Sequence, residues 1–535
     1  MIPMTLADIA RVTGGTLSES ADPQATVTSY VEFDSRKITP GGLFVALPGS
    51  NVDGHDFAES AIARGAVGAL VAREVGVPAV ILPPVEQIEG DNSDLAAGDP
   101  DGSARAVVAG MAKLAGHVAR PLVDKHGLRI TGVTGSAGKT STKDLIANVL
   151  GQGGETVAPP GSFNNEIGLP YTVLRCTENT DFLVAEMSAR NVGHIAQLAS
   201  IAPPHIGVVL NVGSAHLGEF GSRENIAQAK GELVEALPAD GVAILNADDD
   251  LVAGMAPRTH GRVVRFSAEH GGAAGHGAAE YYATDIKLDD VARATFTMHS
   301  PAGGPQRVSL KVFGAHQVSN ALAAAAVGIE AGLDAATVAD ALSNAHSVSV
   351  NRMDVNTRAD GVTVINDAYN ANPDSMRAGI AALGFTAAAR PGVRSIAVLG
   401  EMGELGSDSV EAHRALGDEL ARYRVTHLVV VGESEETRVL AERAAGRGIQ
   451  THSAGGVDAA ADIVSEIVRT APPGEGNWRN RDDRDVVLVK ASNAVGLWRV
   501  AEILLAEGPA HPQQPNTVPH SPNIPITQPD QEDTG

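Results

Sequence analysis

The sequence predicts an α/β protein with three domains, and three observations support this prediction. The chain has 535 residues, too many for one hydrophobic core, and its length alone suggests about three or four domains. Short β-prone runs alternate with helical patterns, as in parallel sheets covered by helices. One glycine-rich turn joins a strand to a helix in the manner of a phosphate-binding loop. The expected divisions are residues 1–105, 106–346, 347–508 and a tail, 509–535.

The composition favours a globular protein that binds small anionic ligands through local basic groups. Hydrophobic residues make up 43% of the chain, and the net charge is −24 from 40 basic and 64 acidic residues. This charge argues against nucleic acid or an anionic membrane surface as a partner. The single cysteine, Cys176, excludes an internal disulfide and fits a reducing compartment. Since no apolar run of about 18 residues and no leader pattern is present, we expect a cytoplasmic protein without membrane insertion.

The first region, up to about residue 84, alternates short apolar runs with turns. Met4 to Val12 predicts a helix, and Gly42 to Leu47 and Gly68 to Val71 predict strands. The intervening segment, Phe33 to Phe57, gathers basic and small polar residues around Pro-Gly-Gly and Asp-Gly turns. Loops so rich in donors suit a nucleotide or sugar ligand, but a solvated pair of turns is an equally good interpretation.

Three segments have a composition that argues against a packed core. Glu86 to Ser103 is acidic and rich in Gly and Asp, so we interpret it as a linker that leads into a helix over about Ala104 to Ala119. His260 to Tyr281 is rich in Gly, Ala and His and predicts a surface loop. Residues 509–535 are rich in Pro, Gln, Asn and Asp and cannot bury enough apolar surface to become ordered.

The stretch Leu128 to Leu150 predicts a phosphate cradle. A β-prone run leads into a turn with Gly135 and Gly138, and then into Lys139, Thr140 and a helical pattern. Glycines let backbone N–H groups face phosphate oxygens, the helix start and the lysine add positive charge, and the hydroxyl can reach a phosphate-bound Mg²⁺. The strict pattern requires glycine at position 133, where this chain has Val133, so the loop is a variant. The alternative is a strand-to-helix turn that binds nothing.

Two neighbouring strands and one helix predict a site beside this loop. The strand within Asp181 to Arg190 delivers Glu186 to the carboxyl edge of the sheet, and the next strand leads to Asn211 and His216. The following helix has Ser222 as a plausible N-cap and carries Lys230 on its apolar stripe. Lys230 either extends to water from the edge of that stripe or is buried as a neutral amine. A neutral amine there can add CO₂ to form a carbamate, which would be an anionic Mg²⁺ ligand beside Glu186 and His216.

The last region predicts a third α/β unit with a parallel sheet. Strands are expected at Val362 to Ile365, Ser395 to Leu399, His427 to Val431 and Asp485 to Val489. The glycines at positions 400, 403 and 406 do not match the dinucleotide-binding fingerprint, so a Rossmann cofactor is not indicated.

Taken together, several motifs resemble those of the Mur ligase family of bacterial cell-wall synthesis. They occur in family order over roughly residues 30 to 500, and they are SRKITPGGLFVALPG with DGHDF, TGSAGKTSTKD, GSFNNEIGLP, AEMSAR, NVGSAHLGEFGSRENIAQAKGE, HQVSN, NRMDV, NDAYNANPDSM and VLGEMGELG. The Asp-Ala-Tyr-Asn-Ala-Asn-Pro piece resembles the branch that adds D-alanyl-D-alanine to a UDP-N-acetylmuramoyl-tripeptide. The chain departs from the usual pattern at Gln317, where the family commonly has Asn, and at the segment KASN, which begins at Lys490.

The resemblance implies the cofactors and roles of particular residues. The first domain would bind the UDP end of the substrate, the central domain ATP and Mg²⁺, and a Rossmann-like third domain would close over the site and admit the amine. Lys139 would hold the transferring phosphoryl group, and Lys230 would carry a CO₂-derived carbamate. The metal ligands would be Thr140, Glu186, His216 and the modified Lys230. The ATP-binding residues would be Thr134, Gly135, Ser136, Ala137, Gly138, Lys139, Thr140, Ser141, Asn320, Arg352 and Asp367. The substrate-binding residues would be Ser35, Arg36, His55, Asn164, Asn165 and Arg190.

The activity that the resemblance implies is ATP-dependent amide ligation. ATP would phosphorylate a peptide carboxylate, and the amine of D-alanyl-D-alanine would attack the acyl phosphate to release ADP and phosphate. We expect the protein to act as a monomer on these two substrates. The alternatives are a ligase of the same family for a different amino acid and a nucleotide-binding regulator that has the fold without the reaction.

Overall fold

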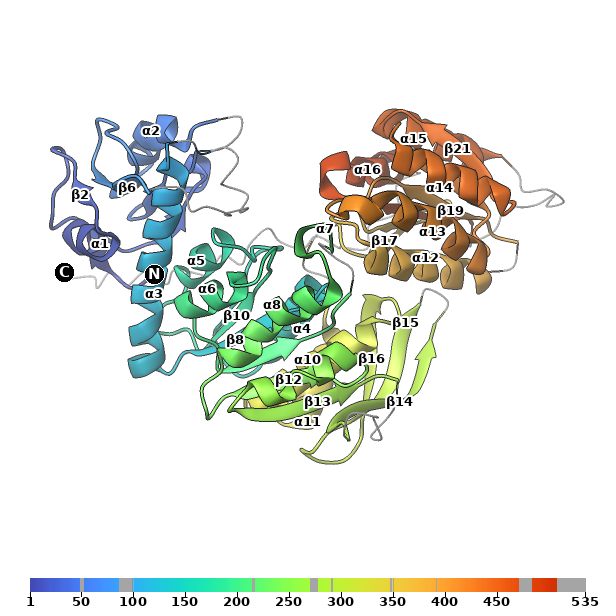
Figure 1. The fold of residues 1–535 in the computed structure, drawn as a ribbon, viewed down its shortest axis with the longest axis horizontal. Coiled ribbons are helices and arrows are strands. Elements are labelled where there is room, and N and C mark those ends of the chain that lie inside the picture. The colour runs from blue at the N-terminus through green and yellow to red at the C-terminus, as the bar shows by residue number, and fades with distance from the viewer. Residues whose placement is uncertain are drawn as a thin grey trace, which may run out of the picture.

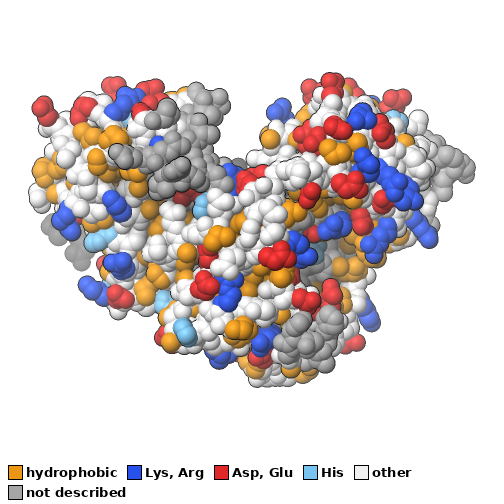
Figure 2. Space-filling model, viewed as in Figure 1, with side chains coloured by type: hydrophobic (Ala, Val, Ile, Leu, Met, Phe, Trp, Pro, Cys, Tyr) orange, Lys and Arg blue, Asp and Glu red, His pale blue; other side chains and the backbone are white. Residues whose placement is uncertain are grey.

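The computed structural model describes residues 1–48, 52–85, 99, 101–213, 217–269, 278–289, 292–346, 349, 351–390, 392–470 and 484–507. The chain folds around three main sheets, each built largely from parallel strands (Figure 1). In the space-filling view a notch separates the N-terminal and C-terminal lobes, and the central part of the chain forms its floor (Figure 2). The predicted three-domain α/β class is confirmed.

The N-terminal lobe is a small sheet with a helix on each face. The sheet has the order β2-β7-β6-β5-β4, in which only β2 is antiparallel to its neighbour. Leu43 and Val45 face α1, whereas Phe44 between them packs with α2, because successive side chains of a strand point to opposite faces. The elements are β1 (Met4–Thr5), α1 (Leu6–Thr13), β2 (Thr16–Leu17), β3 (Thr26–Val27), β4 (Val31–Glu32), β5 (Leu43–Val45), α2 (Ala58–Ala63), β6 (Gly68–Val71) and β7 (Ala79–Ile81).

The central sheet has nine strands in the order β16-β15-β14-β13-β12-β11-β8-β10-β9. It is parallel from β9 to β14, and β14, β15 and β16 form an antiparallel extension. β10 and β11 lie on opposite sides of β8, so the strand order reverses there, and ligands of open α/β sheets bind at such a point. The strands are β8 (Arg129–Thr134), β9 (Thr156–Val157), β10 (Phe182–Glu186), β11 (Ile206–Val209), β12 (Val242–Asn246), β13 (Arg262–Ser267), β14 (Tyr281–Leu288), β15 (Arg293–His299) and β16 (Gln306–Phe313).

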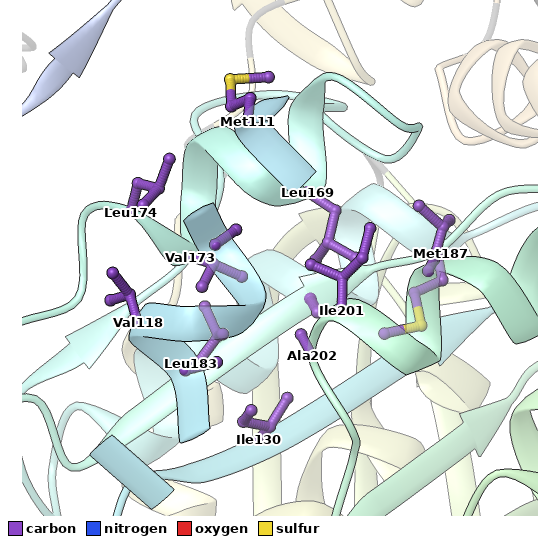
Figure 3. Close-up of a cluster of buried hydrophobic side chains, with 14 of the residues drawn as sticks. Met111, Val118, Ile130, Leu169, Val173, Leu174, Leu183, Met187, Ile201 and Ala202 are labelled. Atoms are coloured by element: carbon purple, nitrogen blue, oxygen red, sulfur yellow. The ribbon is translucent and has the colours of Figure 1, made fainter. Parts of the chain in front are cut away.

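Helices cover both faces of the central sheet. One face packs against α3, α5, α6 and α8, and Figure 3 shows part of this core, in which Met111, Val118 and Leu169 lie over Ile130 and Leu183. The opposite face packs against α4, α10 and α11. The helices of this region are α3 (Ser103–His126), α4 (Lys139–Leu150), α5 (Gly168–Val173), α6 (His194–Ile201), α7 (Leu217–Phe220), α8 (Arg223–Glu235), α9 (Asp250–Ala253), α10 (Gln317–Glu330) and α11 (Ala335–Asn344).

The C-terminal lobe is a six-stranded sheet in the order β17-β18-β22-β19-β20-β21, with only β17 antiparallel. Helices α12, α13 and α14 cover one face, and α15 and α16 cover the other. The elements are β17 (Asp354–Thr357), β18 (Thr363–Asn366), α12 (Pro373–Ala388), β19 (Ser395–Leu399), α13 (Ser409–Arg422), β20 (His427–Val431), α14 (Glu435–Gly446), β21 (Gln450–Ala454), α15 (Val457–Arg469), β22 (Val486–Lys490) and α16 (Trp498–Glu507).

Two sequence predictions are corrected by the structure. The predicted surface loop His260 to Tyr281 contains β13 (Arg262–Ser267), whose Val264 and Phe266 are buried in the core. The strand was missed because the Gly/Ala/His composition of the second half of the segment was taken to describe all of it. The predicted helix Ala104 to Ala119 is the longer α3 (Ser103–His126). Most of the predicted linker and the whole predicted tail lie outside the described residues. Within the described residues, no helix combines the length and apolar character needed to cross a bilayer.

Candidate active site

The glycine loop lies at the carboxyl end of β8 and leads into α4. Gly138 has φ 82° and caps the start of α4, and a Cβ there would lie 2.7 Å from Asn320 Oδ1, so only glycine fits. The loop is also tied to the end of β11, because Ala137 N–H donates to Asn211 Oδ1 over 2.9 Å. Its backbone therefore has a fixed shape at a helix N-terminus, which is the geometry that suits a phosphate group.

Lys139 and Thr140 continue this loop into the helix. Lys139 Nζ donates to Gly135 O over 2.7 Å, which folds the side chain back over the loop. Burial lowers the pKa of Lys139, and the carboxylate of Glu186 opposes that shift. Thr140 is buried and its Oγ1 donates to Glu186 Oε2 over 2.9 Å. The loop and the end of β10 thus form one polar cluster.

Glu186 is a buried carboxylate that ends β10, as the sequence predicted. Besides Thr140, it accepts hydrogen bonds at Oε1 from Ser162 Oγ over 2.9 Å and from Asn164 Nδ2 over 2.8 Å. Its burial is tolerated because three donors compensate the lost hydration. Carboxylate and hydroxyl oxygens so arranged are the ligands that Mg²⁺ prefers, so the residues present fit such an ion.

Lys230 lies on α8 with only 3% of its surface exposed, so the alternative that it extends into water is excluded. Among the described residues none forms an ion pair or hydrogen bond with it. Burial lowers the pKa of Lys230 well below its ordinary value of 10.5, and the charge of Lys139 lowers it further. The environment therefore favours the neutral amine.

A cleft of about 690 Å³ lies between the glycine loop with Glu186 and the C-terminal lobe. The C-terminal lobe approaches the loop closely: Asn372 Nδ2 donates to Ser136 O over 3.4 Å, and a Cβ on Gly213 would lie 1.9 Å from Asp374 Oδ2. Arg190 Nη2 donates to Glu404 Oε1 over 3.1 Å and adds an ion pair between the central domain and the C-terminal lobe. Segments far apart in the sequence therefore enclose one site.

The predicted nucleotide-contacting residues come from α10, from the segment before β17 and from the end of β18, and Asn320 lies against Gly138 of the loop. Asn320 Nδ2 donates to Gln317 Oε1 over 2.9 Å, and the Arg352 guanidinium lies 4.1 Å from the centre of the Tyr369 ring. Asp367 accepts from Lys490 Nζ over 2.6 Å. All of these line the cleft.

The predicted loop and substrate-binding residues divide into two groups. Those that line the cleft are Ser136, Ala137, Gly138, Lys139, Thr140, Ser141, Asn164, Asn165, Glu186, Arg190, Asn320, Arg352 and Asp367. Thr134, Gly135 and Lys230 do not line it.

The three residues predicted from the first domain lie elsewhere. Ser35 is buried in a short 3-10 helix, and exposed Arg36 Nε donates to Asp34 over 2.9 Å. His55 is 3% exposed: Nδ1 lies 2.6 Å from Asp53 Oδ1 and Nε2 accepts from Ala72 N–H, so both ring nitrogens have partners.

His216 lies outside the described residues. Among those that are described, no three His, Cys, Asp or Glu side chains cluster as a metal site. The cleft residues to which the sequence assigned no specific role include Ser162, Asn211, Tyr369 and Lys490. Ser162, Asn211 and Tyr369 stand within quoted motifs, so membership of a motif was the signal available for them.

Comparison with known proteins identifies the family. A UDP-N-acetylmuramoyl-tripeptide--D-alanyl-D-alanine ligase of Mycobacterium bovis is 51% identical over 516 residues, which are 95% of this chain and 98% of the relative. The chain belongs to the Mur ligase family. An Escherichia coli relative of the same name is 34% identical over 81% of this chain and 87% of its own length. Family models match in order: the Mur ligase family catalytic domain at 28–99, the Mur ligase middle domain at 133–328 and the Mur ligase glutamate ligase domain at 351–493.

Solved structures agree with this assignment. A MurF of Acinetobacter baumannii superposes on this Mur ligase with a TM-score of 0.76 at 27% identity, covering 94% of this chain and 99% of that one. The MurF ligase of Thermotoga maritima, solved in complex with ADP, gives a TM-score of 0.67 at 27% identity and covers 90% and 98% of the two chains.

Proposed function

We propose that this chain is an ATP-dependent ligase of peptidoglycan precursor synthesis that joins D-alanyl-D-alanine to UDP-N-acetylmuramoyl-tripeptide. The observation that carries the proposal is the 51% identity, over nearly the full length of both chains, to a ligase of that name. The glycine loop, Glu186 and the buried Lys230 supply the groups that such a reaction needs. The proposal includes the expectation that the protein acts as a monomer.

The loop residues hold the phosphates of ATP in this proposal. The backbone N–H groups at the start of α4 face the anion, and the Lys139 ammonium neutralises charge on the transferring phosphoryl group. Asn320, Arg352 and Asp367, which line the same cleft, contact the nucleotide in this proposal. Stabilisation of the developing charge by fixed donors is the largest contribution that this chain makes to the rate.

Glu186, Thr140, His216 and Lys230 hold Mg²⁺ in this proposal, with Lys230 in its carbamate form. The ion supplies charge neutralisation at the transferring phosphoryl group. The low pKa of Lys230 supports the modification, because only a neutral amine adds CO₂. In ¹³CO₂-equilibrated buffer, the wild type should give a carbamate carbon signal in NMR spectra that Lys230→Met lacks. The same spectrum from both proteins would exclude the carbamate.

The three domains divide the remaining work. Residues 1–105, including Ser35, Arg36 and His55, bind the UDP end, residues 106–346 bind ATP, and residues 347–508 close the site and admit the amine. Asn164, Asn165 and Arg190 face the peptide. Phosphorylation converts its carboxylate to an acyl phosphate, which the amine then attacks. The contact between Asn372 and Ser136 brings the C-terminal lobe against the loop, and this closure keeps water from the acyl phosphate.

The test is ADP release with UDP-N-acetylmuramoyl-tripeptide and D-alanyl-D-alanine together. We expect release to require both substrates, and hydroxylamine should trap a hydroxamate from tripeptide and ATP alone. A preference for another amine would identify a different ligase of the family. ATP binding without any substrate-dependent ADP release would identify a regulator.

A further inference from the structure

The described lining of the cleft includes a carboxylate with a buried oxygen that has no hydrogen-bond donor, that of Glu166. Glu166 follows Asn164 and Asn165 in the segment GSFNNEIGLP and lines the cleft with them. Its Oε1 is buried and accepts no hydrogen bond in the described part of the chain. A buried carboxylate oxygen without a donor costs free energy, so its retention needs an explanation.

The other carboxylates that line the cleft are all engaged. Each accepts hydrogen bonds or forms an ion pair: Glu186 with Thr140, Ser162 and Asn164; Asp249 with the N–H groups of Val212, Leu251 and Val252; Asp367 with Lys490; Asp374 with Arg377; Glu404 with Arg190. Within the described lining, Glu166 is therefore the acidic group with acceptor capacity left for a ligand.

The backbone around Glu166 is held in place on both sides. Asn165 Oδ1 accepts from Gly168 N–H over 3.0 Å and from Ile167 N–H over 3.3 Å, and Asn164 O accepts from Ser188 N–H over 2.9 Å. A Cβ on Gly168 would lie 2.5 Å from the carbonyl carbon of Phe163, so the turn is tight. Glu166 is thus presented by a fixed turn rather than by a loose loop.

The charges of the cleft decide which ligand group suits this carboxylate. Basic and titratable groups from several elements line the cleft: Lys139, Arg190, His194, Arg223, His316, Arg352, Tyr369 and Lys490. The lysines and arginines among them suit phosphate and carboxylate ligands but repel a cation. The amine substrate enters as an ammonium ion, and it must meet an acceptor that no basic group already occupies.

We propose that Glu166 binds the ammonium group of the incoming dipeptide and accepts its proton, an inference that rests on the proposed function. The proton moves from nitrogen to the Glu166 carboxylate, and the freed lone pair forms the C–N bond at the acyl carbon. The C–O bond to phosphate then breaks. The second N–H proton leaves with the phosphate, and the first is released from Glu166 to water.

Comparing two nucleophiles distinguishes a role of Glu166 in amine attack from a role in forming the acyl phosphate. Near pH 7, hydroxylamine is largely neutral and needs no base, whereas D-alanyl-D-alanine is largely protonated at its amine. In Glu166→Gln, we expect hydroxamate formation from tripeptide and ATP within about twofold of wild type. Ligation of D-alanyl-D-alanine should fall by about 10²- to 10⁴-fold, the usual contribution of a positioned proton acceptor. The KM for the dipeptide should rise, and the KM for the tripeptide should not change.

Glu178→Gln, an exposed change in the same domain, is the matched control and should leave both reactions unchanged. Should Glu166→Gln not fold, Glu166→Asp keeps the charge, shortens its reach and permits the same comparison. An equal loss of both reactions, normal ligation, or a raised KM for the tripeptide would overturn the assignment of Glu166. Absence of hydroxamate from the wild type would instead reject the proposed function.

Discussion

Buried basic side chains occur in both the C-terminal lobe and the central domain, but in opposite electrostatic settings. Arg394 lies just before β19 and pairs with buried Asp485 just before β22, with Nε donating to Oδ1 over 3.0 Å. Its Nη2 donates to Thr470 O over 2.9 Å as well. Lys230 on α8 is just as buried and has no such partner in the described part of the chain.

The difference distinguishes a charged side chain that stabilises the fold from a basic side chain that is available for chemistry. Burial of a charge is costly unless an opposite charge and hydrogen bonds compensate it, and Arg394 has both. Burial lowers the pKa of Lys230, which favours a neutral, nucleophilic amine inside the protein. A buried basic group that lacks a counter-charge is therefore a strong indication of a functional site.

Lys230→Ala tests the chemical side of this comparison, and we expect it to have the largest effect on activity. Without the amine, the proposed metal ligand is lost, and we expect ligation to fall by about 10³-fold or more, which is the scale for loss of a fixed group that stabilises developing charge. Added formate or acetate should restore part of the activity in the ADP-release assay. Turnover near that of the wild type would exclude the proposed role of Lys230.

Arg394→Met tests the structural side of the comparison. Removal of the arginine leaves the buried Asp485 carboxylate without a counter-charge, so the free energy of unfolding should fall by about 3–5 kcal/mol in urea titrations. Arg394→Met combined with Asp485→Leu should recover most of the loss. Lys230→Met should cost little by the same measurement, because it strands no partner. Equal losses from the two single changes would contradict the distinction.

His413 is a buried histidine of the C-terminal lobe that should make the stability of the protein depend on pH. The ring is fully buried, with Nε2 accepting from Met402 N–H over 2.9 Å and Nδ1 2.7 Å from Ser409 O. Burial lowers the pKa of His413 below its ordinary value of 6.5. The unfolded chain therefore binds a proton that the folded chain does not, and stability present above pH 6.5 is lost as the pH falls through the lower folded pKa.

We expect His413→Gln to make the unfolding free energy less dependent on pH between about pH 7 and 5, as urea titrations across that range would show. If the unfolding free energy of the variant changed with pH as steeply as that of the wild type, His413 would not be the group responsible for this pH dependence.

The smallest effect is expected from an exposed ion pair of the C-terminal lobe. Arg438 Nη1 lies 2.8 Å from Glu442 Oε1 on α14, and both side chains are more than half exposed. Arg438→Ala should change the free energy of unfolding by less than about 0.5 kcal/mol, because solvent screens the pair. A loss comparable to that of Arg394→Met would show that burial does not decide the value of these pairs.

The sequence by itself determined the fold class, most strands and the phosphate loop. Buried parallel strands read as apolar runs, and Ser395–Leu399 and His427–Val431 begin and end where the pattern predicted. β21 (Gln450–Ala454) escaped notice because it is an edge strand whose residues are mostly polar. The position of Glu186 at a strand end and the apolar stripe that includes Lys230 were also predicted from the sequence, because both follow from local periodicity.

Only the tertiary structure decided which of the predicted polar residues share one cleft and which are already satisfied. Asn164 reaches Glu186 across 22 residues of sequence, and Asn372 reaches Ser136 across 236. Local periodicity encodes the face on which a side chain lies, but it carries no information about which distant segment packs against that face. The burial of Lys230, the engagement of His55 and the unused acceptor of Glu166 are properties of such packing.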